Sequence, residues 1–209
     1  MDRENYTMLC DFYEFTMSNG YFQNGMKDQI CYFDVFFRSV PDSGSYAIAC
    51  GLEFVIDYIK NLKFTDEDIK YLESKKIFSK EFLDYLKDFK FSGDIYAVKE
   101  GSIVFPHEPL IVVKAKAIEA QLIETYLLLI MNHQSLIATK TNRIVRAANG
   151  RAVMEFGARR AQGSSASILG ARSAYIAGAI GTSNAQADRD YGVPAIGTMA
   201  HSWVQMFDS

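Results

Sequence analysis

The chain has 209 residues, of which 49% are hydrophobic and 22% are charged, and this composition excludes a disordered polypeptide and predicts one or two folded cores. Its formal net charge of −3 provides no basic surface for DNA, RNA or an anionic membrane. The apolar run at residues 127–131 is far too short to span a bilayer, and the acidic start lacks the apolar segment of a secretory signal. We therefore expect a cytoplasmic protein without nucleic-acid or membrane partners.

The first part of the chain predicts a mixture of helices and strands. Residues 6–26 carry closely spaced aromatic side chains and indicate a short helix. Residues 31–37 predict a strand whose aromatic side chains suggest burial on both faces, and residues 41–46 are typical of a turn. From residue 52 to 91, lysines and acidic residues alternate with apolar residues at helical spacing. This pattern predicts two or three amphipathic helices with a solvated outer face.

The middle of the chain predicts strands followed by one long helix. Residues 93–115 hold three short β-rich runs separated by turn residues, which indicates an antiparallel meander. A helix from about residue 118 to 148, broken or kinked near Asn132, would follow and connect two regions. The three cysteines, Cys10, Cys31 and Cys50, are odd in number and lack zinc-ligand spacing. We expect reduced thiols and no metal site among them.

The composition changes after this helix. Lys140 is the last lysine, and eight of the 14 glycines lie between Gly150 and Gly197. We therefore expect an amino-terminal α/β domain with its linking helix over residues 1–149 and a second domain over residues 150–209.

The second domain predicts strand, helix, strand, helix and strand in quick succession, which is typical of βαβ units with parallel pairing. Such a sheet is either doubly wound or part of a (β/α) barrel. A complete barrel takes about 250 residues, so residues 150–209 suffice for roughly two or three of its eight units. If the domain is a barrel, we expect the chain to contain its first part alone.

Side chains suited to binding follow each of the three predicted parallel strands, at residues 155–160, 181–184 and 197–202. Ligands bind beyond the carboxyl ends of strands in such sheets. A flat aromatic acid could stack on a phenylalanine, pair with a guanidinium and hydrogen-bond to hydroxyl groups. The candidates are Phe156, Arg159 or Arg160, Ser183, Thr198 and Ser202. A core role for Phe156 and a surface ion-pair role for the arginines remain open.

His201 is the candidate for catalysis, because it lies in a predicted turn after a strand rather than on an apolar helix face. It could act as a general acid or base, or as a nucleophile toward phosphorus, and a structural role remains open. No lysine follows Lys140, which argues against a Schiff-base aldolase that uses this part of the barrel. The chain also lacks the Walker and GxGxxG fingerprints.

Six segments occur in a fixed order: LCDFYEFTMSNGYF, FFRSVPDSGSYAIACGLE, VKEGSIVFPHEPLI, EFGARRAQG, GTSNAQADRDYGVPAIGT and AHSW. Through them the chain resembles the nicotinate phosphoribosyltransferase family over essentially its whole length. The resemblance implies an α/β fold with a sandwich-like amino-terminal domain and the first part of an irregular (β/α) barrel of the type II phosphoribosyltransferase kind. It also implies a homodimer that condenses nicotinate with phosphoribosyl pyrophosphate to nicotinate mononucleotide in NAD biosynthesis, with ATP hydrolysis and Mg²⁺.

The resemblance also implies roles for single residues. His201 matches the phosphorylated histidine, and Phe156 and Tyr13 match the two aromatic walls of the pyridine site, with Tyr13 reaching in from the neighbouring subunit. Arg159 matches an arginine that contacts phosphate or carboxylate groups. Ser183 lies where nicotinamide-using relatives carry an aspartate, which would repel the carboxylate of nicotinate.

One departure from the family pattern leaves alternatives open. The later barrel strands that should hold the ribose 5′-phosphate do not occur in residues 1–209, and the ATP and metal sites are expected outside them as well. The chain alone could therefore be inactive. The alternatives are a nicotinamide- or quinolinate-using relative and a truncated, non-catalytic fragment that at most dimerises.

Overall fold

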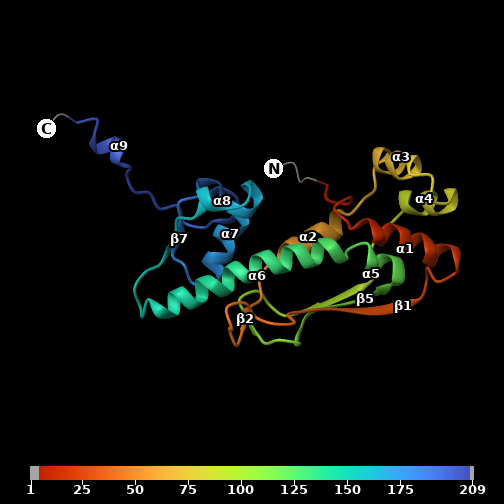
Figure 1. Ribbon diagram of the computed structural model, residues 1–209, viewed down its shortest axis with the longest axis horizontal. Helices are drawn as coiled ribbons and strands as arrows, with labels where there is room; N and C mark the ends of the chain where they lie inside the picture. Colours follow the sequence, from red (N-terminus) through yellow and green to blue (C-terminus); the bar gives the residue numbers. More distant parts are fainter. Residues whose placement is uncertain (1–4, 208–209) are drawn as a thin grey trace. The chain divides into compact units, whose positions relative to one another are not determined.

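The structure is a computed structural model that describes residues 5–207, and the chain forms two compact units that divide between Asn132 and His133. This division lies inside the longest helix, α6 (Glu124–Ala147), which is labelled in Figure 1. The second unit thus includes the carboxyl-terminal part of α6, which the expected boundary assigns to the first domain. The boundary at residues 149 and 150 remains a prediction.

The first unit contains a three-stranded antiparallel sheet of order β1-β5-β3, formed by β1 (Ile30–Phe36), β5 (Pro109–Lys116) and β3 (Asp94–Ala97). The short helix α5 (Ala117–Gln121) packs against β1 and β5, and α1 (Phe12–Gln23) packs against α5 (Figure 1). The central strand β5 turns alternate side chains into the core, as expected for a sheet covered on one face. These buried residues are Ile111, Val113 and Ala115.

The expected burial of the first strand on both faces is wrong. β1 lies at the edge of its sheet, and its residues alternate between exposed and half-buried positions. The side chain of Tyr32 is 64% exposed, whereas Phe33, which pairs with Val113, is half-buried. Helices cover a single face of this sheet, so the aromatic residues on the other face remain at the surface.

The expected meander is correct in its antiparallel pairing but wrong in its order. β3 pairs directly with β5, and the intervening strand β4 (Ile103–Val104) pairs instead with β2 (Ala47–Ile48). Backbone hydrogen bonds of 2.8–2.9 Å between Ala49 and the Gly101–Ser102 turn hold β4 beside β2. Ala47, Ile48 and Val104 are buried, so this small sheet contributes to the core.

Three amphipathic helices fill residues 52–91, as predicted: α2 (Leu52–Asn61), α3 (Asp66–Ser74) and α4 (Lys80–Lys87). α3 begins with a reciprocal capping box between Thr65 and Asp68, which satisfies backbone groups that the first helical turn leaves free. The Ser79 side chain caps α4 in a similar way. Their apolar faces are buried through Val55, Tyr58, Ile69, Leu72, Phe82, Leu83 and Leu86.

The break expected near Asn132 lies earlier in the chain. Helical structure is interrupted at Leu122 and Ile123, between α5 and α6, whereas α6 is continuous through Asn132. Leu122 and Ile123 are both buried, so packing holds the interruption in place. Asparagine is a weak helix former, but burial of the preceding Ile130 and Met131 outweighs that small preference. No described helix is both long and apolar enough to cross a bilayer.

The second unit contains the predicted βαβ units. β6 (Met154–Glu155) pairs in parallel with β7 (Gly181–Thr182), and α7 (Ser164–Ile176) connects them. Helix α8 (Ala185–Tyr191) follows, and the expected third strand is reduced to one parallel bridge between Thr182 and Ala195. Parallel pairing is therefore confirmed. The core of this unit combines Ile168, Ala171, Ala187 and Val193 with the half-buried Tyr191.

Candidate functional site

The carboxyl ends of the parallel strands meet at one edge of the second unit. Glu155 pairs with Thr182, and Thr182 bridges to Ala195, so the residues that follow emerge together. Phe156 directly follows β6, and Ser183 directly follows β7. The Ser183 backbone N–H donates to the Glu155 carbonyl oxygen at 3.1 Å. The structure therefore brings Phe156 and Ser183 to neighbouring positions on this strand edge.

Gly181 allows the strands to approach this closely. A Cβ atom at position 181 would lie 2.6 Å from the Pro194 carbonyl oxygen and 2.6 Å from the Ile196 Cδ1 atom. Two backbone hydrogen bonds join Thr182 to the segment that follows α8. The Thr182 N–H donates to the Pro194 carbonyl oxygen, and the Ile196 N–H donates to the Thr182 carbonyl oxygen. The glycine is thus required by close packing of backbone against backbone.

Glu155 is a structural residue of the strand edge that the sequence predictions missed. One of its carboxylate oxygens accepts a 2.7 Å hydrogen bond from the Thr182 hydroxyl, and the other accepts from the Gly157 N–H. The Thr182 side chain is fully buried, so its hydroxyl needs such a partner. An acidic residue at the last position of a short parallel strand was the available signal, because polar groups at strand ends face the ligand edge.

The two arginines after β6 differ in their surroundings. Both belong to a short 3₁₀ helix, η1 (Ala158–Arg160), and both side chains are exposed. Arg160 donates from Nη1 to the Phe156 carbonyl oxygen at 3.4 Å. Arg159 makes no hydrogen bond or ion pair with any residue between Asn5 and Phe207. Arg159 therefore has the free guanidinium that could pair with an anionic ligand.

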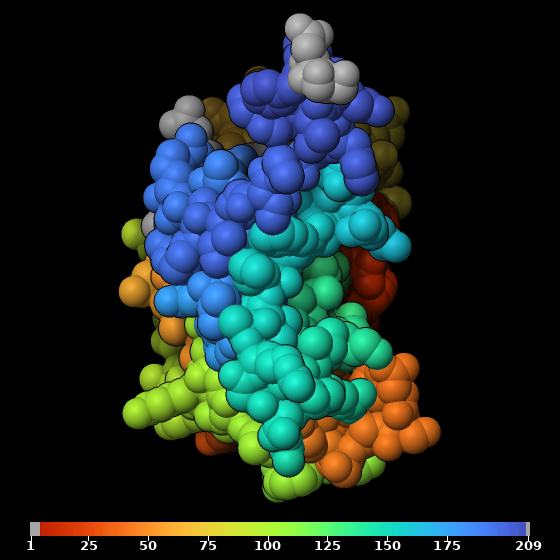
Figure 2. All heavy atoms as spheres, turned by 90° about the vertical axis from the view of Figure 1, so that its left-hand side faces the viewer, coloured from red at the N-terminus to blue at the C-terminus, as the bar shows by residue number. Residues whose placement is uncertain are grey.

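Thr198, His201 and Ser202 lie farther along the chain and are all exposed. His201 does not lie in a turn as expected: it begins the short helix α9 (His201–Val204). Figure 2 shows this segment in blue at the surface. The structure thus places them after the third strand end, without a hydrogen bond from these three side chains to Phe156 or Ser183 within the described residues.

Asn184 fixes the start of the helix that follows Ser183. Its side-chain oxygen accepts hydrogen bonds from the backbone N–H groups of Gln186 and Ala187 at 3.1 and 3.2 Å. Its amide donates to the Ser167 hydroxyl at 2.9 Å and so ties α8 to α7. This N-cap holds the backbone of Ser183 between β7 and α8.

Tyr13 belongs to the first unit, in the first turn of α1, and its side chain is 45% exposed. Its hydroxyl donates to Glu124 Oε1 at 3.0 Å. Partial burial of the hydroxyl and this hydrogen bond raise the pKa of Tyr13 to about 12. The predicted contact with a neighbouring subunit remains a prediction.

Glu14, the residue after Tyr13, has a buried carboxyl group. The Glu14 side chain is fully buried and accepts hydrogen bonds of 2.6 Å from the Cys10 thiol and from the Thr125 hydroxyl. Burial raises the pKa of Glu14, and the two hydrogen bonds oppose this shift only in part. Burial and the neighbouring Glu14 also raise the pKa of the Cys10 thiol. Cys10, Cys31 and Cys50 are free thiols.

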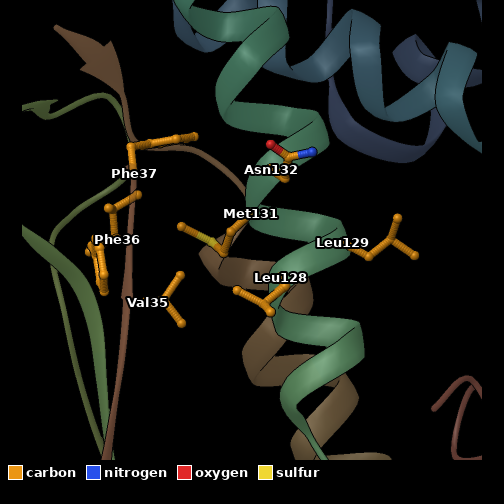
Figure 3. A pocket seen from close by; sticks show the side chains of 8 residues that line it. Val35, Phe36, Phe37, Leu128, Leu129, Met131 and Asn132 are labelled. Carbon is orange, nitrogen blue, oxygen red and sulfur yellow. The ribbon is translucent and has the colours of Figure 1, made fainter. Parts of the chain in front are cut away.

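The first unit also contains an apolar groove between β1 and α6 (Figure 3). Its volume is about 330 Å³, and Leu128 and Met131 extend from α6 toward Val35 on β1. None of the predicted site residues lines it. Its lining carries no charged side chain, so it lacks the cation that would recognise an aromatic acid.

The described residues contain no complete metal-binding group. Among residues 5–207, no group of three or more His, Cys, Asp or Glu side chains could hold one. Mg²⁺ usually keeps several waters and binds through one or two carboxylates together with substrate phosphates. The described residues therefore do not form a complete metal site by themselves.

Models of two protein families match the chain. The nicotinate phosphoribosyltransferase (NAPRTase) N-terminal domain matches residues 8–132, and the NAPRTase family model matches residues 151–209. Nicotinate phosphoribosyltransferase pncB2 of Mycobacterium tuberculosis is 46% identical over 202 residues, which cover 97% of this chain and 43% of that protein. The nicotinate phosphoribosyltransferase of Bacillus subtilis is 42% identical over 204 residues, covering 98% of this chain and 42% of its own length.

Solved structures show the same similarity. The crystal structure of human nicotinic acid phosphoribosyltransferase matches with a TM-score of 0.86 and 33% identity, covering 94% of this chain and 40% of that one. Nicotinate-nucleotide pyrophosphorylase from Pyrococcus furiosus shares the fold, with a TM-score of 0.77, 23% identity, and coverage of 99% of this chain and 47% of that one.

The parallel βαβ units and the match to the human structure show that the chain has the α/β fold of a phosphoribosyltransferase. Because the two family models together match residues 8–132 and 151–209, the chain belongs to the nicotinate phosphoribosyltransferase family. It spans about 43% of the length of the Mycobacterium tuberculosis relative.

Proposed function

We propose that this protein is a nicotinate phosphoribosyltransferase, which condenses nicotinate with phosphoribosyl pyrophosphate to form nicotinate mononucleotide and pyrophosphate in NAD salvage. Membership of the family supports this proposal. The observation that carries it is the parallel register, which brings Phe156 and Ser183 to one edge, with the unpaired Arg159 following Phe156 in η1. These three side chains have the chemistry to recognise a flat aromatic carboxylate.

In the proposed complex, the pyridine ring stacks on Phe156 and the carboxylate pairs with Arg159. The Ser183 hydroxyl can donate a hydrogen bond to the carboxylate without adding negative charge. The pyridine nitrogen attacks C1 of the ribose while the bond from C1 to the pyrophosphate oxygen breaks. Holding the ring in line with that bond contributes through orientation.

Thr198 and Ser202 are proposed substrate contacts, and His201 is the proposed phosphorylated histidine. All three are exposed, so a nucleotide or pyrophosphate could reach them. An imidazole in the first turn of a short helix is accessible for phosphoryl transfer from ATP. ATP and Mg²⁺ enter this proposal through family membership. No step is assigned to the metal, because the described residues form no complete metal-binding group by themselves.

We further propose that the protein acts as a homodimer in which Tyr13 of one subunit covers the pyridine site of the other. The exposed apolar side chains of the α1 region support this, since a surface of this kind is typical of an interface. Phe12, Tyr13 and Met17 are each 41–45% exposed. The ring of Tyr13 is therefore available to a second chain.

A product assay with radiolabelled pyridines tests the proposed function. The longest natural form of the protein is incubated with phosphoribosyl pyrophosphate, ATP and Mg²⁺, together with nicotinate, nicotinamide or quinolinate. We expect nicotinate mononucleotide as the main product and efficient competition by nicotinate alone. A strong preference for nicotinamide or quinolinate would contradict the assignment, and absence of any product would favour a non-catalytic fragment.

The His201→Ala variant tests the histidine separately. If His201 is phosphorylated, this variant loses ATP-dependent labelling from γ-³²P-ATP and loses the stimulation of product formation by ATP. The matched control is His107→Ala, since His107 lies in the other unit and lacks a proposed role. Labelling and ATP stimulation that both survive in His201→Ala would show that another residue is phosphorylated.

A further inference from the structure

The hydroxyl of Tyr13 is held by an acid whose two oxygens are both occupied. Glu124 Oε1 accepts from the Tyr13 hydroxyl at 3.0 Å, and Glu124 Oε2 accepts from Gln121 Nε2 at 2.7 Å. Gln121 is buried on α5, so it provides a fixed anchor for the carboxylate. Glu124 lies in the first turn of α6, where the helix dipole favours a negative charge. The acceptor that Tyr13 meets is therefore held in place.

A second set of hydrogen bonds joins α1 to α6 without Tyr13. The Thr125 hydroxyl donates to Glu14 at 2.6 Å and accepts from the Asp11 backbone N–H at 3.0 Å. This link connects the start of α1 to the start of α6 and is largely buried, because Glu14 is fully enclosed. The bond between Tyr13 and Glu124 is thus not needed to hold the helices together. This hydrogen bond mainly restricts the position of the Tyr13 side chain.

The Tyr13 side chain is held by a hydrogen bond at its hydroxyl and is partly exposed. Its side chain is 45% exposed, and it makes no aromatic ring contact within residues 5–207. A side chain with this exposure samples several rotamers unless a hydrogen bond restricts it. Restricting it before a ligand arrives reduces the entropy lost on binding.

We propose that Glu124 is a positioning residue for Tyr13, which fixes the aromatic ring in the orientation that stacks on the pyridine substrate. This inference rests on the proposed function. Glu124 itself does not touch the substrate in this scheme and acts through the Tyr13 hydroxyl.

Steady-state kinetics of the longest natural form of the protein test the proposal. In Glu124→Ala, we expect the KM for nicotinate to rise about threefold to tenfold, the range for one preorganised side chain, while kcat changes less than twofold. Glu124→Gln retains a side-chain oxygen acceptor and should restore KM to within twofold of the wild type. The matched control is Glu81→Ala, because Glu81 also lies in the first turn of a helix.

A double-mutant cycle tests whether the two residues act together. Tyr13→Phe removes the same hydrogen bond from the other side and keeps the ring, so it should raise KM by a similar factor. The double variant Tyr13→Phe with Glu124→Ala should then be no worse than either single variant. Effects that multiply in the double variant, or a KM unaffected by Glu124→Ala, would overturn the proposal.

The hydrogen bond has its own readout, which needs no activity. NMR titration of ¹³C-labelled tyrosine, with Tyr13→Phe for assignment, should show the pKa of Tyr13 falling from about 12 toward 10.0 in Glu124→Ala. An unchanged Tyr13 pKa would show that Glu124 does not hold the Tyr13 hydroxyl, and it would overturn the inference. A wild-type protein that turns over no pyridine overturns the proposed function, and the inference falls with it. An active wild type with unchanged KM in the variant overturns the inference alone.

Discussion

The buried Glu14 carboxyl group makes a testable contribution at the scale of single residues. Its pKa is raised above the ordinary value of 4.5, so the folded chain holds the proton more tightly than the unfolded chain. The contribution of Glu14 to stability is therefore fully present below pH of about 4.5 and is lost as the pH rises through the folded-state pKa. In Glu14→Gln this dependence should disappear.

Urea unfolding between pH 4 and 8 measures the effect. The free energy of unfolding of the wild type minus that of Glu14→Gln should fall as the pH rises. The Gln side chain can still accept from the Thr125 hydroxyl, so the comparison isolates the titrating group. A difference that stays constant or increases with pH would show that the pKa of Glu14 is not raised in the folded chain.

Gly181 offers a second test at the same scale. A methyl group there would clash with the Pro194 backbone at 2.6 Å, so Gly181→Ala should destabilise the second unit by about 1–3 kcal/mol. Gly170→Ala is the matched control, because Gly170 lies inside α7 with nothing within 4 Å of an added Cβ atom. Gly170→Ala should stabilise the second unit by about 0.5–1 kcal/mol.

Hydrogen–deuterium exchange measures both glycine variants. The amides of Ile180 and Thr182 report most directly, since they donate to Val153 and Pro194 across the parallel segments. Faster exchange in Gly181→Ala and slower exchange in Gly170→Ala are expected. Equal exchange in the two variants would show that the close approach at Gly181 does not constrain the strand edge.

At the scale of elements, the N-cap of α8 supports the segment that carries Ser183. Asn184→Ala removes two hydrogen bonds to backbone N–H groups and one to Ser167, which should cost about 1 kcal/mol of stability. Asn184→Asp keeps the capping oxygen and should recover most of that loss. Thermal unfolding of the two variants provides the measurement. Equal destabilisation would mean that the contact with Ser167, rather than the cap, holds this helix.

The type of each element could be predicted from local sequence patterns, whereas the element that it pairs with could not. The three helices of residues 52–91 appear where periodic apolar residues and capping residues predict them. The pairing of β4 with β2 was unpredictable, because it depends on contacts between segments about 55 residues apart. The break at Leu122 was missed for a similar reason, since tertiary burial of Leu122 and Ile123 decides it. Local propensity predicts the type of an element better than it predicts which other elements pack against it.

The candidate site follows the same rule. Its strand ends could be located from the βαβ pattern, and the parallel register confirms that Glu155 and Thr182 lie side by side. The carboxylate of Glu155 was missed, because its role depends on a buried hydroxyl one strand away. The start of α9 at His201 was also unexpected, since a single helical turn leaves little periodic signal.

At the scale of the whole molecule, the chain combines two compact units, and the proposed site residues are divided between them. Tyr13 lies in the first unit, whereas Phe156, Arg159 and Ser183 lie in the second. In the proposed homodimer, the site of one subunit would receive Tyr13 from the other. The chain spans 43% of the length of the Mycobacterium tuberculosis relative.

Selectivity between pyridine acid and amide tests the central claim most directly. The measurement compares kcat/KM for nicotinate with that for nicotinamide in the wild type, in Ser183→Asp and in the matched, uncharged control Ser183→Asn. A carboxylate at this position should repel nicotinate, so Ser183→Asp should lower the ratio at least tenfold, about 1.4 kcal/mol. Ser183→Asn should change it much less. An unchanged ratio in Ser183→Asp would show that the pyridine carboxylate does not bind at this strand edge.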